Sequence, residues 1–306
     1  MKKKITIGTR GSKLALIYAR IAEQKINKFK SRFAIKSVNI KKVTTKGDKI
    51  QSKRLSDIGG KGLFTKKIEN ELLNRKIDIA VHALKDIPSR ENKKLFTNCF
   101  LKRNDPREVL ITRKNKKFKS LPKNSIVGTS SFRREFQLKR MRKDLIYKLI
   151  RGNVDTRIKK LEKGEYDAIL LSKAGIDALQ LEHKISQEFS IDELIPCAGQ
   201  GIIAIQCRED DNEIKKLLEN INDEDSRIVA NAEREVLKVL EGDCDTAVGV
   251  FAKINGENVD LVTELFSTDG EQRYYLKESV EREKITVTSR YIGEKLKLQS
   301  KGSYKN

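Results

Sequence analysis

The sequence predicts an α/β fold in which two α/β domains precede a smaller α+β C-terminal domain with an antiparallel sheet. Strand-like runs alternate with amphipathic helical segments along most of the chain, and from Val248 consecutive strands replace this alternation. The chain has 306 residues, more than a single hydrophobic core usually organises. We therefore predict a first domain at 1–101 and 201–220, a second at 106–195 and a third at 223–306.

The first domain is predicted from β-loop-α units. Residues 4–8 alternate as in a strand, and the apolar residues of 14–26 fall close to one face of a helix. The strand 37–45 leads into a glycine-rich loop, a helical segment around Ile68 and the apolar strand 77–84. Strands that alternate with helices usually form a mostly parallel sheet covered on both faces, which we expect here.

The second domain repeats the alternation. After Pro106, strand-like runs begin at Ser125, Leu145 and Asp167, with helical segments between them. The segment 197–210 then resembles a strand that crosses back to the first sheet.

The third domain is predicted from a change of pattern. A polar helix is expected from about Asp225 to Leu240, followed by strands at 248–254, 259–267 and 274–279. The tail 298–306 lacks apolar periodicity, so we expect a short final helix and a frayed end.

The charge of the chain points to an anionic partner. The formal net charge is +22, which raises nucleic acid as an alternative because clustered cations release phosphate counterions. However, the lysines run through the whole chain, aromatic residues make up only 6%, and there is no tryptophan. The basic stripe with interleaved aromatic residues that single-stranded nucleic acid favours is missing, so we expect a small anionic substrate and no nucleic acid.

Cysteine and histidine usage argues against a metal centre. The only histidines are His82 and His183, and no CxxC pair occurs among the four cysteines, which are Cys99, Cys197, Cys207 and Cys244. No apolar run is long enough to span a bilayer, and the N-terminus passes from lysines straight into a strand pattern. We therefore expect a cytoplasmic protein with reduced thiols, no metal and no membrane partner.

Two strand-to-helix turns share a small internal repeat. One is Gly8-Thr9-Arg10-Gly11-Ser12 and the other is Gly128-Thr129-Ser130-Ser131. Glycine permits close backbone approach, and a serine or threonine cap leaves helix N–H groups pointing at an anion. Two such turns predict a cleft between the domains, although either turn alone could be an ordinary helix cap.

Arginines gather where strands lead into helices. Ligands of open α/β sheets bind at this edge, and a guanidinium can grip a carboxylate or phosphate with two hydrogen bonds. A solvated helix face is the alternative for a pair such as Arg133-Arg134. The five arginines at these turns predict a ligand with several carboxylates or phosphates; they are Arg10, Arg133, Arg134, Arg151 and Arg157.

Asp86 follows an apolar strand and precedes Pro88, beside Lys85. A carboxylate held among cations can stabilise positive charge or move a proton, although an Asp that caps the turn before a proline fits the local sequence equally well. His82 lacks a nucleophilic partner nearby and is predicted to pack in the core.

Two further segments are candidates for ligand contact. Three glycines surround Lys61 without the spacing of a Walker loop, so we predict a glycine-rich loop that covers a cleft with Lys61 and Phe64, or else a structural turn. Cys244 lies between Asp243 and Asp245, and neighbouring carboxylates disfavour a thiolate. The local sequence therefore leaves open whether Cys244 is a slow attachment point or an inert loop residue.

Taken together, these motifs resemble the porphobilinogen deaminase family along nearly the whole chain. The resemblance is carried by motifs in the family's order and spacing: IGTRGSKLAL, IGGKGLFTKKIE, AVHALKDIP, RNDPREVLI, VGTSSFRRE, IRGNVDTR, CAGQGIIAIQCR and LEGDCDTAVG. No single short motif would suffice.

The resemblance implies two domains of periplasmic-binding-protein type around a cleft, and a third domain that presents a dipyrromethane cofactor bound covalently through Cys244. It implies that Asp86 is catalytic, that Lys61 and Phe64 belong to an active-site loop, and that the protein is monomeric. The remaining implied cofactor ligands are Lys85, Thr129, Ser130, Ser131, Arg133, Arg134 and Arg157. The implied substrate ligands are Arg10, Ser12, Arg151 and Gln200.

The implied activity is that of a transferase that condenses four porphobilinogen molecules into hydroxymethylbilane, with loss of ammonia at each step. The chain departs from the family at four positions, where Ala83, Asp243, Asp245 and Ala247 replace the commoner Ser, Gly, Gln and Pro. The main rival is a two-lobed anion-binding protein that closes on a carboxylate without reacting.

Overall fold

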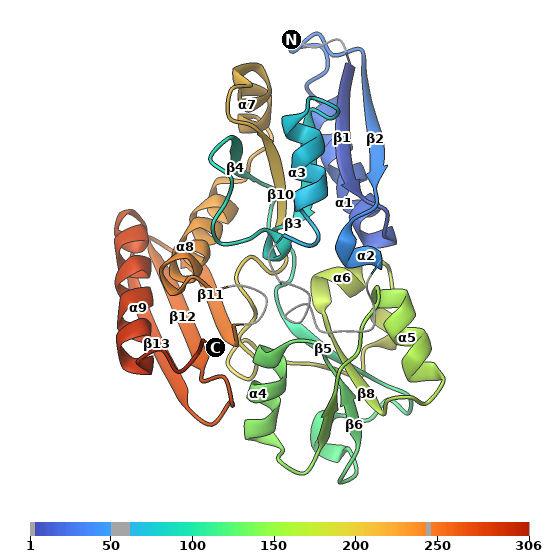
Figure 1. Cartoon of the computed structure of the whole chain (residues 1–306), viewed down its shortest axis with the longest axis vertical. Helices are drawn as coiled ribbons and strands as arrows, with labels where there is room; N and C mark the ends of the chain where they lie inside the picture. The colour runs from blue at the N-terminus through green and yellow to red at the C-terminus, as the bar shows by residue number, and fades with distance from the viewer. Residues whose placement is uncertain (1–3, 50–61, 243–245, 306) are drawn as a thin grey trace.

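The structure is a computed structural model that describes residues 4–49, 62–242 and 246–305. Within these ranges the chain forms two five-stranded sheets and one three-stranded sheet. Figure 1 shows the two larger sheets, each with its own helices, one above the other, and the three-stranded sheet beside them. The predicted fold class, two α/β units followed by an α+β unit with an antiparallel sheet, is confirmed.

The first sheet, with strand order β2-β1-β3-β10-β4, organises one α/β lobe. Its strands are β1 (Lys4–Arg10), β2 (Ser37–Val43), β3 (Ile79–Ala83), β4 (Leu95–Phe100) and β10 (Ile203–Arg208). β1 pairs in parallel with β2 and β3, whereas β10 runs antiparallel to β3 and β4. The predicted return of the chain to this sheet is thus confirmed, and the sheet is mixed rather than mostly parallel because the returning strand enters from the opposite end.

Helices cover both faces of this sheet. They are α1 (Lys13–Asn27), α3 (Lys66–Leu73) and α7 (Asn212–Glu219), and the short α2 (Lys46–Lys49) follows β2. Ala22 and Ile26 of α1 pack in one core cluster with Ile5 and Ile7 of β1. Residues of α3 form a separate cluster on the opposite face with Ala80. Burial of both faces explains why β3 is a continuous apolar run.

The second sheet, with strand order β7-β6-β8-β5-β9, organises the other lobe. Its strands are β5 (Glu108–Thr112), β6 (Ile126–Gly128), β7 (Ile146–Lys148), β8 (Ala168–Ser172) and β9 (Gln187–Glu188). The helices are α4 (Phe132–Met141), α5 (Val154–Glu162) and α6 (Lys173–Ala178). β6 is parallel to β7 and β8, and β5 is antiparallel to β8 and β9. This sheet is therefore also mixed.

The C-terminal unit packs against the first lobe. Its elements are α8 (Glu224–Leu240), β11 (Val248–Asn255), β12 (Asn258–Phe266), β13 (Arg273–Glu281) and α9 (Ile285–Ser300). The three strands form an antiparallel meander, as predicted. Its core cluster includes Val236 of α8 and Ile292 of α9, and it continues into Leu84 and Phe100 of the first lobe. The third unit therefore shares apolar packing with the first.

The expectation of a short final helix and a frayed end is wrong for the described residues. Helix α9 has 16 residues and extends to Ser300. Beyond it, Lys301 and Gly302 adopt positive φ values of 47° and 82°, which turn the chain back. Tyr304 is 4% exposed, and its hydroxyl donates a hydrogen bond to the Leu240 carbonyl at 3.1 Å. A single anchoring aromatic residue leaves no periodic signal in the sequence.

Two features are absent from the described residues. No helix in these ranges combines the length and the apolar character needed to cross a membrane. No group of three or more His, Cys, Asp or Glu side chains is placed there to hold a metal ion.

Candidate active site

Two adjoining cavities lie between the lobes. The first chamber, of about 440 Å³, is lined from the first lobe by Arg10, Ser12 and Asp86 and from the second lobe by Arg151 and Arg157. The second chamber, of about 250 Å³, extends to Gly242 and Thr246. The two chambers share six lining residues, which are Phe64, Lys85, Asp86, Ser130, Arg134 and Arg157. Cys244, the residue predicted to bind the cofactor covalently, lies outside the described residues, in the segment between Gly242 and Thr246.

The two repeated turns form the predicted caps. The Ser12 hydroxyl accepts a hydrogen bond from the Ala15 backbone at the start of α1, at 3.3 Å. The Ser131 hydroxyl accepts one from the Arg134 backbone at the start of α4, at 3.4 Å. Ser12 and Ser130 line the first chamber from opposite lobes. Because both turns border the same chamber, their N-terminal helix ends favour an anion between the lobes.

Thr129 has a supporting position in the second turn. It is 1% exposed, and its hydroxyl accepts a hydrogen bond from the Ser131 backbone at 3.2 Å. Thr129 therefore shapes the turn, while Ser130 and Ser131 border the second chamber.

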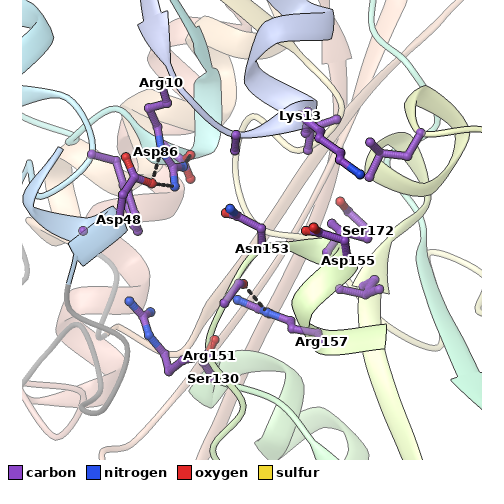
Figure 2. Close-up of a pocket in the computed structure, with 18 of the residues that line it drawn as sticks. Arg10, Lys13, Asp48, Asp86, Ser130, Arg151, Asn153, Asp155, Arg157 and Ser172 are labelled. Carbon is purple, nitrogen blue, oxygen red and sulfur yellow. Dashed lines mark hydrogen bonds and ion pairs between the residues drawn. The ribbon is translucent and has the colours of Figure 1, made fainter. Parts of the chain in front are cut away.

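Arg10 and Asp86 meet at the edge of the first sheet. Asp86 ends the short 3₁₀ helix η2 (Leu84–Asp86), which follows β3, and Arg10 ends β1. Because these parallel strands end at the same edge, Arg10 Nη1 lies 3.5 Å from Asp86 Oδ2. Asp86 retains 29% side-chain exposure. Figure 2 shows both residues on one side of the first chamber, with Ser130, Arg151 and Arg157 on the facing side.

Asp48 is a site residue that sequence reasoning missed. Its Oδ1 accepts hydrogen bonds from Arg10 Nη2 at 2.5 Å and Nε at 3.1 Å, and its Oδ2 accepts from the Thr45 hydroxyl at 2.7 Å. Burial raises the pKa of Asp48, but the Arg10 and Thr45 donors outweigh burial and hold the pKa below its ordinary value. The spacing of Thr45 and Asp48, three residues apart beside Gly47, was the available sequence signal.

Phe64 contacts the same guanidinium. The Arg10 Cζ lies 4.0 Å from the Phe64 ring centroid, a cation–π geometry. Phe64 also lines both chambers. Its predicted loop partner Lys61 lies outside the described residues.

Two buried groups lie behind the Arg10–Asp86 pair. His82 is 5% exposed, as predicted for a core residue. Burial, reinforced by the positive charge of Arg10, lowers the pKa of His82 to about 4, so the imidazole is neutral at pH 7. Burial, with the Asp86 charge as a second cause, raises the pKa of Tyr18 to about 12.

Gln200 holds the Lys85 side chain through a hydrogen bond. Gln200 is fully buried, its Oε1 accepts a hydrogen bond from Lys85 Nζ at 3.2 Å, and its Nε2 donates to the Pro106 carbonyl at 2.7 Å. Cys197 is half-buried, borders the second chamber and lies 3.5 Å from the same Gln200 oxygen. Cys99 and Cys207 are buried.

Four arginines of the second lobe crowd around the chambers. Arg133 and Arg134 are 3% and 8% exposed, so the alternative of a solvated helix face is wrong. Arg151 is 6% exposed, and Arg157 donates from Nε to the Gly152 carbonyl at 2.8 Å. Burial, followed by the charges of Arg134 and Arg151, lowers the pKa of Arg157 to about 10. Such crowding of like charges favours an anionic ligand.

Two α/β lobes that enclose an arginine-lined cleft, with one carboxylate on the wall common to both chambers, define a protein built to bind a ligand with several carboxylates. Two family models match the sequence: "Porphobilinogen deaminase, dipyromethane cofactor binding domain" over residues 5–216, and "Porphobilinogen deaminase, C-terminal domain" over residues 228–299. The chain belongs to the porphobilinogen deaminase family. The predicted family and the predicted dipyrromethane-binding domain are thereby confirmed.

Curated relatives agree with this assignment. The porphobilinogen deaminase of an Exiguobacterium species is 42% identical over 271 residues, which cover 88% of each chain. That of Bacillus subtilis is 40% identical over 272 residues, which cover 88% of this chain and 86% of the relative. Among solved structures, the periplasmic aliphatic sulphonate binding protein SsuA of Escherichia coli is 12% identical with a TM-score of 0.43, covering 79% of this chain and 73% of that one.

Proposed function

We propose that this chain is a porphobilinogen deaminase that joins four porphobilinogen molecules head to tail into hydroxymethylbilane, with Asp86 as the catalytic carboxylate. The observation that supports this most strongly is the position of Asp86 on the wall shared by the two chambers. A group at that boundary can serve both the end of a growing chain and an incoming unit. Family membership supports the proposed reaction, and the geometry supports the proposed roles of the residues.

The second chamber is the proposed place of the dipyrromethane, attached through Cys244. Its cationic and hydroxyl donors suit acetate and propionate groups, and Arg134 Nε is a buried donor with no hydrogen-bond partner among the described residues. When bound, the cofactor supplies the free pyrrole carbon to which units are added. The residues proposed to hold it are Lys85, Ser130, Ser131, Arg133, Arg134 and Arg157, with Thr129 shaping their turn.

The first chamber is the proposed place of the incoming porphobilinogen. Arg10 and Ser12 reach it from the first lobe and Arg151 from the second, so carboxylates of one substrate can be gripped from both sides. Gln200 acts through Lys85. Phe64, which lines both chambers, and Lys61 are the proposed residues of the active-site loop. Fixed carboxylates hold the reacting carbons in one orientation, which removes much of the entropic cost of joining two molecules.

The proposed role of Asp86 is to stabilise positive charge on the reacting pyrrole ring. Loss of ammonia from the substrate leaves positive charge on a pyrrole ring, and a preorganised carboxylate at the boundary stabilises that charge as the new carbon–carbon bond forms. Arg10 fixes the carboxylate through the contact at 3.5 Å. Asp86 is also placed to accept the pyrrole proton lost after each addition.

We further propose that the protein works in the cytoplasm as a monomer, with the domain limits predicted above. The separate core clusters of the two lobes support these limits. Porphobilinogen is the proposed partner, without nucleic acid or membrane.

Incubation of the purified protein with porphobilinogen tests the proposal. We expect four ammonia molecules released for each tetrapyrrole formed, and nearly none from the Asp86→Asn protein. The rival, a binding protein that closes without reacting, would show a ligand-dependent rise in melting temperature and no ammonia. That second result would overturn the proposed function.

A further inference from the structure

The carboxylate of Glu108 lies buried beneath the arginine pair of the second chamber. Glu108 begins β5 and is fully buried. Its Oε1 accepts a hydrogen bond from Arg133 Nη2 at 2.6 Å, and its Oε2 lies 2.7 Å from Arg134 Nη2. One carboxylate therefore binds two consecutive arginines, one with each oxygen.

Both guanidinium groups are fixed at a second point. Arg133 Nη1 donates to the Ile195 carbonyl at 2.7 Å, and Arg134 Nη1 donates to the Leu170 carbonyl at 3.2 Å. Each arginine is thus held between Glu108 and a backbone oxygen. This arrangement orients the pair without any ligand and leaves Arg134 lining both chambers.

The charges of this cluster sum to +1, from two guanidinium groups and one carboxylate. Two adjacent buried cations without a counter-charge would repel each other and lose hydration. Burial raises the pKa of Glu108, but Arg134 and Arg133 outweigh burial and hold the pKa well below its usual range. Glu108 therefore stays ionised and offsets one of the two guanidinium charges.

We propose that Glu108 is a positioning residue for ligand capture: it aligns Arg133 and Arg134 and sets their joint charge, so that the pair receives one carboxylate of the pyrrole chain in the second chamber. This inference rests on the proposed function. Glu108 touches no ligand itself, because it is fully buried behind the two guanidinium groups. Its loss should therefore slow capture of the cofactor without removing any ligand contact.

The test compares how fast cofactor-free protein acquires the covalent adduct from porphobilinogen, followed by intact mass under denaturing conditions. Glu108→Gln keeps the shape and removes the charge, and we expect loading to slow by about tenfold or more. Glu108→Asp keeps the charge on a shorter side chain, and we expect partial rescue, to within about threefold of wild type. The melting temperature of each variant measures its loss of stability separately from its loading rate.

Glu233 provides a matched control. It is also fully buried and is bound to one arginine, Arg103, with Nη1 to Oε1 at 2.6 Å, but it borders neither chamber. Glu233→Gln should lower the melting temperature while the folded fraction loads at the wild-type rate. Equal slowing by Glu233→Gln and Glu108→Gln would overturn the proposal, because the effect would then be a general loss of packing.

A wild-type loading rate in Glu108→Gln would also overturn the proposal. If that variant does not fold, Glu108→Asp decides: loading slowed by about two- to threefold at an unchanged melting temperature supports the positioning role, and an unchanged rate overturns it. Failure of the proposed function has a different signature, because the wild-type protein itself would then acquire no adduct.

Discussion

Arg10 Nη1 lies 3.5 Å from Oδ2 of Asp86, so β1 and the segment after β3 present opposite charges to the same cleft. Asp48 binds the other edge of the guanidinium, through Nε and Nη2. The Arg10 side chain is thereby fixed between two carboxylates, and Asp86 lines both chambers.

Asp86→Asn should nearly abolish turnover. The change is almost isosteric, so the fold and the arginine contacts to substrate should survive, while the charge that stabilises the pyrrole cation is lost. We expect kcat to fall by about 100-fold or more, with a smaller change in KM. Steady-state kinetics with porphobilinogen measures both, and near-normal kcat would remove Asp86 from the catalytic role.

Lysine substitutions at the five cleft arginines should each weaken ligand binding, by unequal amounts. Lysine keeps the charge but loses the two-pronged geometry, at a cost of about 1 to 3 kcal/mol where a carboxylate is gripped. Substrate titrations should detect the loss of affinity at Arg10 and Arg151. Cofactor titrations should detect it at Arg133, Arg134 and Arg157. Wild-type behaviour of all five variants would contradict the carboxylate-clamp account.

Asp48→Asn should weaken the hold on Arg10. An amide oxygen is a poorer acceptor than a carboxylate, so the guanidinium gains freedom and kcat/KM should fall by about tenfold, equivalent to 1.4 kcal/mol. Asp155→Asn, at another acidic residue of the first chamber, is the control and should change kcat/KM less. A larger fall in kcat/KM for Asp155→Asn than for Asp48→Asn would contradict the role given to Asp48 and assign it to Asp155.

Folding stability should decrease between about pH 6.5 and pH 4 because of His82. Its folded pKa of about 4 lies below the unfolded value of about 6.5, so on acidification the unfolded chain takes up a proton first. The free energy of unfolding should drop by about 2 to 3 kcal/mol across this range from His82 alone. Denaturant titrations of His82→Gln should lack this drop.

The exposed His183 gives the matching control for this pH effect. His183→Gln should keep the wild-type dependence on pH, because this change leaves the buried His82 imidazole in place. Identical pH profiles for wild type and His82→Gln would contradict the buried, neutral imidazole.

Local sequence was sufficient where the determining contacts are local. The caps at Ser12 and Ser131, the position of Asp86 after an apolar strand and the change to an antiparallel meander at Val248 all depend on residues close in sequence. Periodicity and turn chemistry carry that information.

The features that the sequence did not predict depend on contacts between segments far apart in the chain. Glu108 looks like an ordinary charged residue at a strand start, and only the packing of Arg133 and Arg134, on a helix 25 residues further along, shows why it is buried. The Thr45–Asp48 spacing signals a turn, but only the contact with Arg10 places Asp48 in the site, and only the contact with Leu240 shows that Tyr304 anchors the C-terminal segment. Sequence periodicity contains no record of such pairings.

The most direct test of the account is the intact mass of the purified protein under denaturing conditions, because a thioether survives unfolding. We predict a mass above that of the bare chain by one dipyrromethane, with the adduct mapped to the peptide that contains Cys244. Cys244→Ser should lose the adduct and the activity, even when folded. A bare wild-type chain could reflect incomplete loading, so the measurement is repeated after incubation with porphobilinogen. A wild-type protein that polymerises porphobilinogen while its mass stays that of the bare chain would contradict the covalent assignment.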